Sequence, residues 1–152
     1  MDRSSEALEF ARHAWDFYDA ARGAERLLGE RDEYQLGASL PVACLFGTAM
    51  ELALKAYLLS RRESLSDAAD RGHDMARHFH DASKLGLGNL VRITVGDGQL
   101  IAALSQLCAM PPAQYVALPA DTIPDFASMR KLCDTLVDVA CAMAGYERPV
   151  YD

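Results

Sequence analysis

Basic side chains are in the minority in this sequence. Its 152 residues include 15 Lys and Arg against 22 Asp and Glu, which gives a formal net charge of -7. That balance argues against a protein that holds DNA through its overall electrostatic field, although a local basic site remains compatible with it. Apolar residues make up 51% of the chain, which excludes a disordered protein. The length suits a single domain, residues 1–152, with one core.

The sequence also lacks a CxxC pair, an internal repeat and a low-complexity tail. Its four cysteines are Cys44, Cys108, Cys133 and Cys141. Each lies in an apolar helical context, so we expect buried, reduced thiols in a cytoplasmic protein. The first residues, MDRSSEALEFARH, are polar and acidic and do not form a signal peptide.

The most apolar stretch covers residues 41–62, PVACLFGTAMELALKAYLLSRR, and predicts a helix buried on nearly every side. Its polar residues Thr48, Glu51 and Lys55 follow i, i+3, i+7 spacing and form one narrow strip. Because Glu51 and Lys55 lie in the middle, a membrane span is not expected. Gly47 inside the helix indicates close packing, which we expect against the preceding helix.

Apolar residues at helical spacing predict four further helices, at residues 4–28, 73–85, 97–110 and 124–144. We expect Ser4 or Ser5 to cap helix 4–28 and Asp97 to cap helix 97–110. The segment NLVRITVG, residues 89–96, is predicted as a short extended piece or a loose helical turn. No two segments form a convincing strand pair. The predicted fold class is therefore all-α, a five-helix antiparallel bundle.

Histidines and opposite charges gather between residues 61 and 84. Three of the four histidines, His73, His78 and His80, lie in this segment, and its five basic and five acidic residues cancel. Arg71 comes just before the predicted helix 73–85, where free backbone N–H groups and a cation can hold a phosphate. A solvated helix start with mixed charges is the simpler alternative.

Metal chemistry has weaker support in the sequence. The doublets His73-Asp74 and His80-Asp81 resemble those of metal-dependent phosphohydrolases. That fold needs a further upstream His and a distant Asp around a shared metal, and the only upstream candidate, His13, has no supporting pattern. We therefore predict no metal site and no cofactor.

The pairing of AMELALKAYLL in one helix with GHDMARHFHDASKLGL in the next resembles the HEPN domains of prokaryotes and higher eukaryotes. Three motifs carry the resemblance: Glu51 and Lys55 at i, i+4, then Gly72-His73-Asp74, then Gly86-Leu87. It covers residues 40–88. The resemblance implies a helical bundle linked to nucleotides or RNA, a homodimer, a nucleotidyltransferase partner protein in toxin–antitoxin systems and, in many members, metal-independent RNA cleavage.

Members that cleave RNA carry an Arg, then four to six residues, then a His. Arg71 and His78 fit this formula with six residues between them, although Gly72 stands where such members usually have a polar residue. The motif also often lies near the start of a later helix. The resemblance implies that His78 would act as general base on a ribose 2′-OH and Arg71 would stabilise the charged phosphorane.

We therefore expect a HEPN-like module that binds nucleotide or RNA phosphate near the start of the third helix. In this interpretation Lys55 points into a cleft beside His73 and meets a phosphate, while Glu51 orients it and Arg77 adds a further cation. A plain surface Glu–Lys helix pair, contributing about 0.2–0.5 kcal/mol, is the simpler alternative. Two other functions remain open: a metal-independent, toxin-type endoribonuclease using Arg71 and His78, and a non-catalytic helical interaction protein.

Overall fold

The computed structural model describes residues 2–31, 39–61, 74–111, 113–114, 118–119 and 122–150, and the regular structure of these residues is helical, with no strand among them. The all-α prediction is therefore confirmed. The helices are α1 (Arg3–Gly29), α2 (Leu40–Ser60), α4 (Met75–Lys84), α5 (Leu87–Leu90), α6 (Val95–Cys108) and α7 (Phe126–Ala144). Five of them correspond to the five predicted helices, and α5 is an additional single turn.

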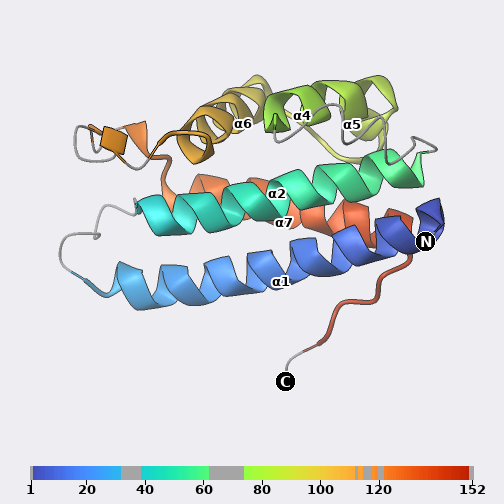
Figure 1. Ribbon diagram of the computed structural model, residues 1–152, viewed down its shortest axis with the longest axis horizontal. Coiled ribbons are helices and arrows are strands. Elements are labelled where there is room, and N and C mark those ends of the chain that lie inside the picture. The colour runs from blue at the N-terminus through green and yellow to red at the C-terminus, as the bar shows by residue number, and fades with distance from the viewer. Residues whose placement is uncertain are drawn as a thin grey trace.

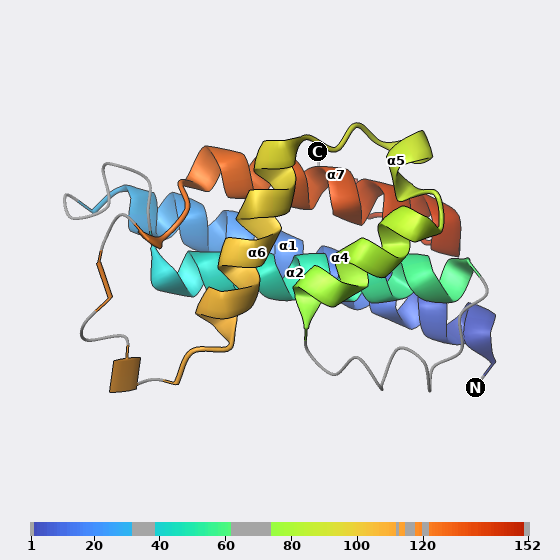
Figure 2. The same ribbon diagram turned by 90° about the horizontal axis from the view of Figure 1, so that it is seen from above.

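The helices form two layers. The long helices α1, α2 and α7 lie lengthwise against one another, and α4, α5 and α6 lie on the side of α2 away from α1 (Figure 1). Seen from above, α4 and α6 cross over α2 and α7 (Figure 2). The helix α1 runs antiparallel to α2, as predicted, whereas α2 and α7 run in the same direction. The reason is that the chain passes through the layer of α4, α5 and α6, back to the end of the molecule where α2 begins, before it enters α7.

The helix α2 is the centre of the core, as its apolar sequence predicts. Twelve of its 21 residues are buried, including Phe46, Leu54 and Tyr57, each at most 1% exposed. Leu45 and Leu52 are only half-buried. Although α2 is long and apolar enough to cross a membrane, 67% of its most apolar window is buried inside the protein. Such burial is typical of a core helix.

Two predicted caps are wrong by a few residues. Asp2, not Ser4 or Ser5, caps α1, because its carboxylate accepts a hydrogen bond of 2.8 Å from the Ser5 backbone N–H. Asp97 is the third residue of α6 rather than its cap. Thr94 is the cap, and the two side chains form a reciprocal capping box of 2.9 and 3.1 Å.

The segment 89–96 is divided between the two predicted structures. Its first two residues complete the single turn α5, and the chain then follows an extended path from Val91 to Thr94, where α6 begins.

Polar contacts join α1 to α7 and to the segment that follows α7. Arg130 of α7 donates a hydrogen bond to the half-buried carboxylate of Glu25. At the middle of α1, the Arg148 guanidinium lies 5.4 Å from the ring centroid of Trp15 and bonds Asp138 at 2.5 Å. The segment after α7 is thereby held against both helices.

Candidate functional site

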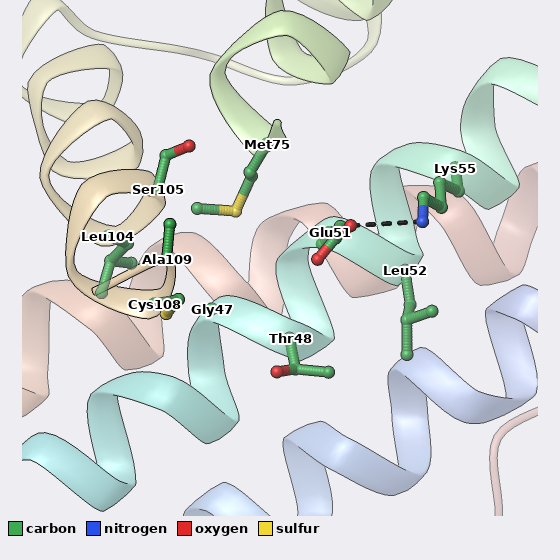
Figure 3. Close-up of a pocket in the computed structure, with 10 residues that line it drawn as sticks. All are labelled: Gly47, Thr48, Glu51, Leu52, Lys55, Met75, Leu104, Ser105, Cys108 and Ala109. Atoms are coloured by element: carbon green, nitrogen blue, oxygen red, sulfur yellow. Dashed lines mark ion pairs between the residues drawn. The ribbon is translucent and has the colours of Figure 1, made fainter. Parts of the chain in front are cut away.

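A pocket of about 400 Å³ lies where α2 faces α4 and α6. Its lining consists of Gly47, Thr48, Glu51, Leu52, Lys55, Met75, Leu104, Ser105, Cys108 and Ala109. The polar strip predicted on α2 therefore faces a pocket rather than the core. Figure 3 shows Lys55 at one end and Cys108 at the other, with Glu51 between them.

Lys55 and Glu51 form the ion pair of this pocket. The Lys55 Nζ lies 3.2 Å from the Glu51 Oε1, and the two side chains are 14% and 17% exposed. The ammonium also lies 6.0 Å from the ring centroid of Phe10 on α1. Because a desolvated charge needs a partner, the pair is more than a solvated surface contact. The predicted pairing of Lys55 with Glu51 is confirmed.

The chemistry of the pocket wall is that of an ammonium, a carboxylate, a thiol and two hydroxyls. The Thr48 hydroxyl already donates to the Cys44 carbonyl oxygen at 2.8 Å, so it is left as an acceptor. Lys55 and Glu51 cancel in charge. The lining therefore suits a small polar group that accepts from the ammonium and donates to the carboxylate.

The start of α4 closes one side of the pocket. Met75, the first residue of α4, is 3% exposed and lines the pocket. Asp74 caps the helix by accepting a hydrogen bond of 3.2 Å from the Arg77 backbone N–H. Arg71 and His73 lie outside the described residues. Among the predicted ligand-binding residues, the structure thus brings Glu51 and Lys55 together, in a pocket that Met75 also lines.

The remaining residues of α4 divide between solvent and core. Arg77 and His80 are exposed, and neither lines the pocket. His78, by contrast, is fully buried. A general base must reach the proton that it removes. In this arrangement the His78 ring is closed off from solvent, and its catalytic role stays a prediction.

Hydrogen bonds join the C-terminal end of α4 to the C-terminal end of α2. The Leu85 carbonyl oxygen accepts hydrogen bonds from the Tyr57 hydroxyl at 2.9 Å and from the Arg61 Nε at 3.1 Å. Gly86 follows with φ of 91°, a left-handed conformation that glycine adopts without strain. These contacts fix α4 against α2 and so hold Met75 at the pocket.

Two of the four cysteines depart from the predicted burial. Cys133 and Cys141 are buried as expected, but Cys108 is exposed and Cys44 is half-buried. The interaction between the Cys108 and Cys44 thiols lowers the pKa of the Cys44 thiol to about 7 and raises the pKa of the Cys108 thiol. Sequence reasoning missed this pair, because nothing local indicates that α6 ends over Cys44.

The described residues contain no group of three or more His, Cys, Asp and Glu placed to hold a metal ion. No family model, curated protein or solved structure matches the chain. The resemblance to HEPN domains therefore stays a prediction, and the functional argument rests on the pocket.

Proposed function

We propose that this protein is a HEPN-like module that binds the phosphate of a nucleotide or RNA, with Lys55 as its central anion-binding group. The observation that carries the proposal is a lysine side chain, only 14% exposed, whose ammonium is held by Glu51 at the edge of a pocket between α2, α4 and α6. Apolar residues of similar volume often serve stability equally well, so stability alone does not account for the pair.

The Lys55 ammonium is the group of this pocket that would bind a phosphate. An ammonium has three donors, and Glu51 occupies only part of this capacity. The reduced solvent exposure strengthens the attraction between Lys55 and an anion relative to a surface lysine. Glu51 opposes an anion that comes too close, so the phosphate should approach Lys55 from the side away from Glu51.

The neighbouring sequence supports the same interpretation. Arg71 and His73 precede Met75 by four residues and two residues, and Met75 lines the pocket. We propose that these side chains complete the phosphate site together with Lys55. Arg77 is exposed and outside the pocket, so we assign it a contact with a longer ligand such as RNA.

A thermal-shift screen tests the proposal. Purified protein is heated with nucleoside mono-, di- and triphosphates and with short RNAs, in EDTA, because a ligand that binds only the folded state raises the midpoint. We expect a phosphate-bearing ligand to raise the midpoint and the corresponding nucleoside to have little effect. Equal shifts with both would contradict phosphate recognition, and no shift with any of them would favour a helical interaction protein.

We also propose that the protein is a cytoplasmic homodimer with a nucleotidyltransferase partner. The support for this assembly is the HEPN resemblance of residues 40–88. Light scattering behind size-exclusion chromatography tests the dimer, and a monomer at all concentrations would contradict it.

A further inference from the structure

We propose that Cys44 and Cys108 form a site of reversible oxidation, at which a peroxide converts the two thiols into a disulfide that joins α2 to α6. The site lies at the edge of the pocket described above, since Cys108 is part of its wall. The proposal rests on the two cysteines and their surroundings and is independent of the phosphate site.

The packing of α6 on α2 brings the Cys108 sulfur to the face of α2 that carries Cys44. Gly47 has no side chain, and the Cys108 Sγ lies 2.7 Å from the position that a Cβ there would take. Cys44 is three residues before Gly47, so it lies one turn away on the same face of α2. The end of α6 therefore places the Cys108 sulfur against the face of α2 that carries Cys44.

The same pair has the reactivity that oxidation requires. The thiolate is the form that reacts with peroxides, and a pKa of about 7 makes a large share of Cys44 thiolate at neutral pH. Cys108 is exposed and Cys44 is half-buried, so a small oxidant reaches them.

The other two cysteines provide an internal contrast. The Cys133 thiol donates to the Phe46 carbonyl oxygen at 3.7 Å, and burial raises its pKa. The Cys141 thiol donates to the Ala11 carbonyl oxygen at 3.8 Å, and burial raises its pKa to about 11. Both are buried, protonated thiols at neutral pH and should resist peroxide.

The chemistry balances with hydrogen peroxide as the oxidant. The Cys44 thiolate attacks one peroxide oxygen, the O–O bond breaks, and the products are a sulfenic acid on Cys44 and hydroxide. The Cys108 sulfur then attacks the Cys44 sulfur, and the S–O bond breaks as the disulfide forms. The Cys108 proton and the hydroxyl groups leave as water, so two thiols and one peroxide give one disulfide and two waters.

Peptide mapping tests the inference. Dilute, fully reduced protein is treated with hydrogen peroxide near neutral pH, unfolded in iodoacetamide, digested without reductant and analysed by mass spectrometry. We expect the peptides containing Cys44 and Cys108 to appear linked, with a chain mass lower by two hydrogens, and dithiothreitol to separate them. The peptides containing Cys133 and Cys141 should be alkylated as in untreated protein.

Matched variants decide the pairing. In Cys108→Ser the linked peptide should vanish and Cys44 should stop at the sulfenic acid, which dimedone traps. In Cys44→Ser, Cys108 should stay mostly a free thiol. The proposal is overturned if both peptides of the wild type remain alkylated after peroxide, if the disulfide joins two chains, or if Cys108 pairs with Cys133 or Cys141.

Discussion

The Cys108 sulfur of α6 lies 2.7 Å from the point that a Cβ on Gly47 would occupy. Real Cβ atoms do not approach another atom so closely, so the end of α6 rests directly on the backbone of α2. The sequence correctly indicates close packing at Gly47, but the neighbour is α6 rather than the predicted first helix. This contact shapes one end of the pocket and brings the exposed cysteine to its partner.

Replacing Gly47 with Ala should therefore have opposite effects in two backgrounds. In the wild type the new methyl group collides with the Cys108 sulfur and should lower the free energy of unfolding by about 1–3 kcal/mol. In the Cys108→Ala background the collision is gone, and Ala should raise stability by up to about 1 kcal/mol through helix propensity. Urea unfolding of the four proteins measures the coupling. Equal effects in both backgrounds would refute the close contact.

The reactivity of Cys44 should depend on pH near neutrality. Its pKa is about 7, so its alkylation by iodoacetamide should be slow below that pH, where the thiol is protonated, and should level off above it. Rates are followed on the Cys44 peptide by mass spectrometry. In Cys108→Ala the neighbouring thiol is lost, and the midpoint should rise toward the ordinary value of about 8.5. An unchanged midpoint in that variant would mean that Cys108 does not set the pKa.

Two leucines two residues apart on α2 should differ in their contribution to stability. Leu54 is 1% exposed, so Leu54→Ala should lower the free energy of unfolding by about 2–5 kcal/mol. Leu52 is half-buried at the pocket, so Leu52→Ala should cost clearly less, because water can fill the space that it leaves. Chemical denaturation compares the two variants, and equal losses would place Leu52 in the core.

Ribonuclease activity should be weak or absent. His78 is fully buried, and a general base out of reach of a ribose hydroxyl removes no proton from it. The assay incubates the protein with a mixed RNA pool in EDTA. The control is Arg71→Ala rather than a change at His78, because replacing a buried ring also perturbs the core. Strong cleavage by the wild type that disappears in folded Arg71→Ala would make the endoribonuclease the correct function.

The sequence predicts where each helix lies in the chain better than it predicts which helices pack against one another. An apolar run identifies α2, and the predicted helix 124–144 corresponds to α7, which Asp125 caps and Gly145 ends, because these signals are local. The sequence does not identify Thr94 as the cap of α6, because the β-branched residues around it favour an extended segment. Its capping box with Asp97 is therefore not predicted.

The part of the site that the sequence predicts also depends on local spacing. Glu51 and Lys55 are four residues apart on one helix, so their pairing follows from helical geometry. The burial of His78 depends on α4 packing against both α2 and α6, which buries a wider arc of α4 than one neighbour would. The contact of Cys108 with α2 joins residues far apart in the chain, and helical periodicity does not specify which helices meet.

The most direct test of the phosphate site is titration calorimetry with the best nucleotide or RNA ligand from the thermal-shift screen. The test variant is Glu51→Gln/Lys55→Met, which removes both charges so that neither is left desolvated and alone. Lys84→Ala, at the exposed end of α4, is the matched control. We predict that the double variant stays folded and weakens binding at least about tenfold, or about 1.4 kcal/mol, while the control binds like the wild type. Unchanged affinity in the folded double variant would contradict the account, because Lys55 would then play no part in holding the phosphate.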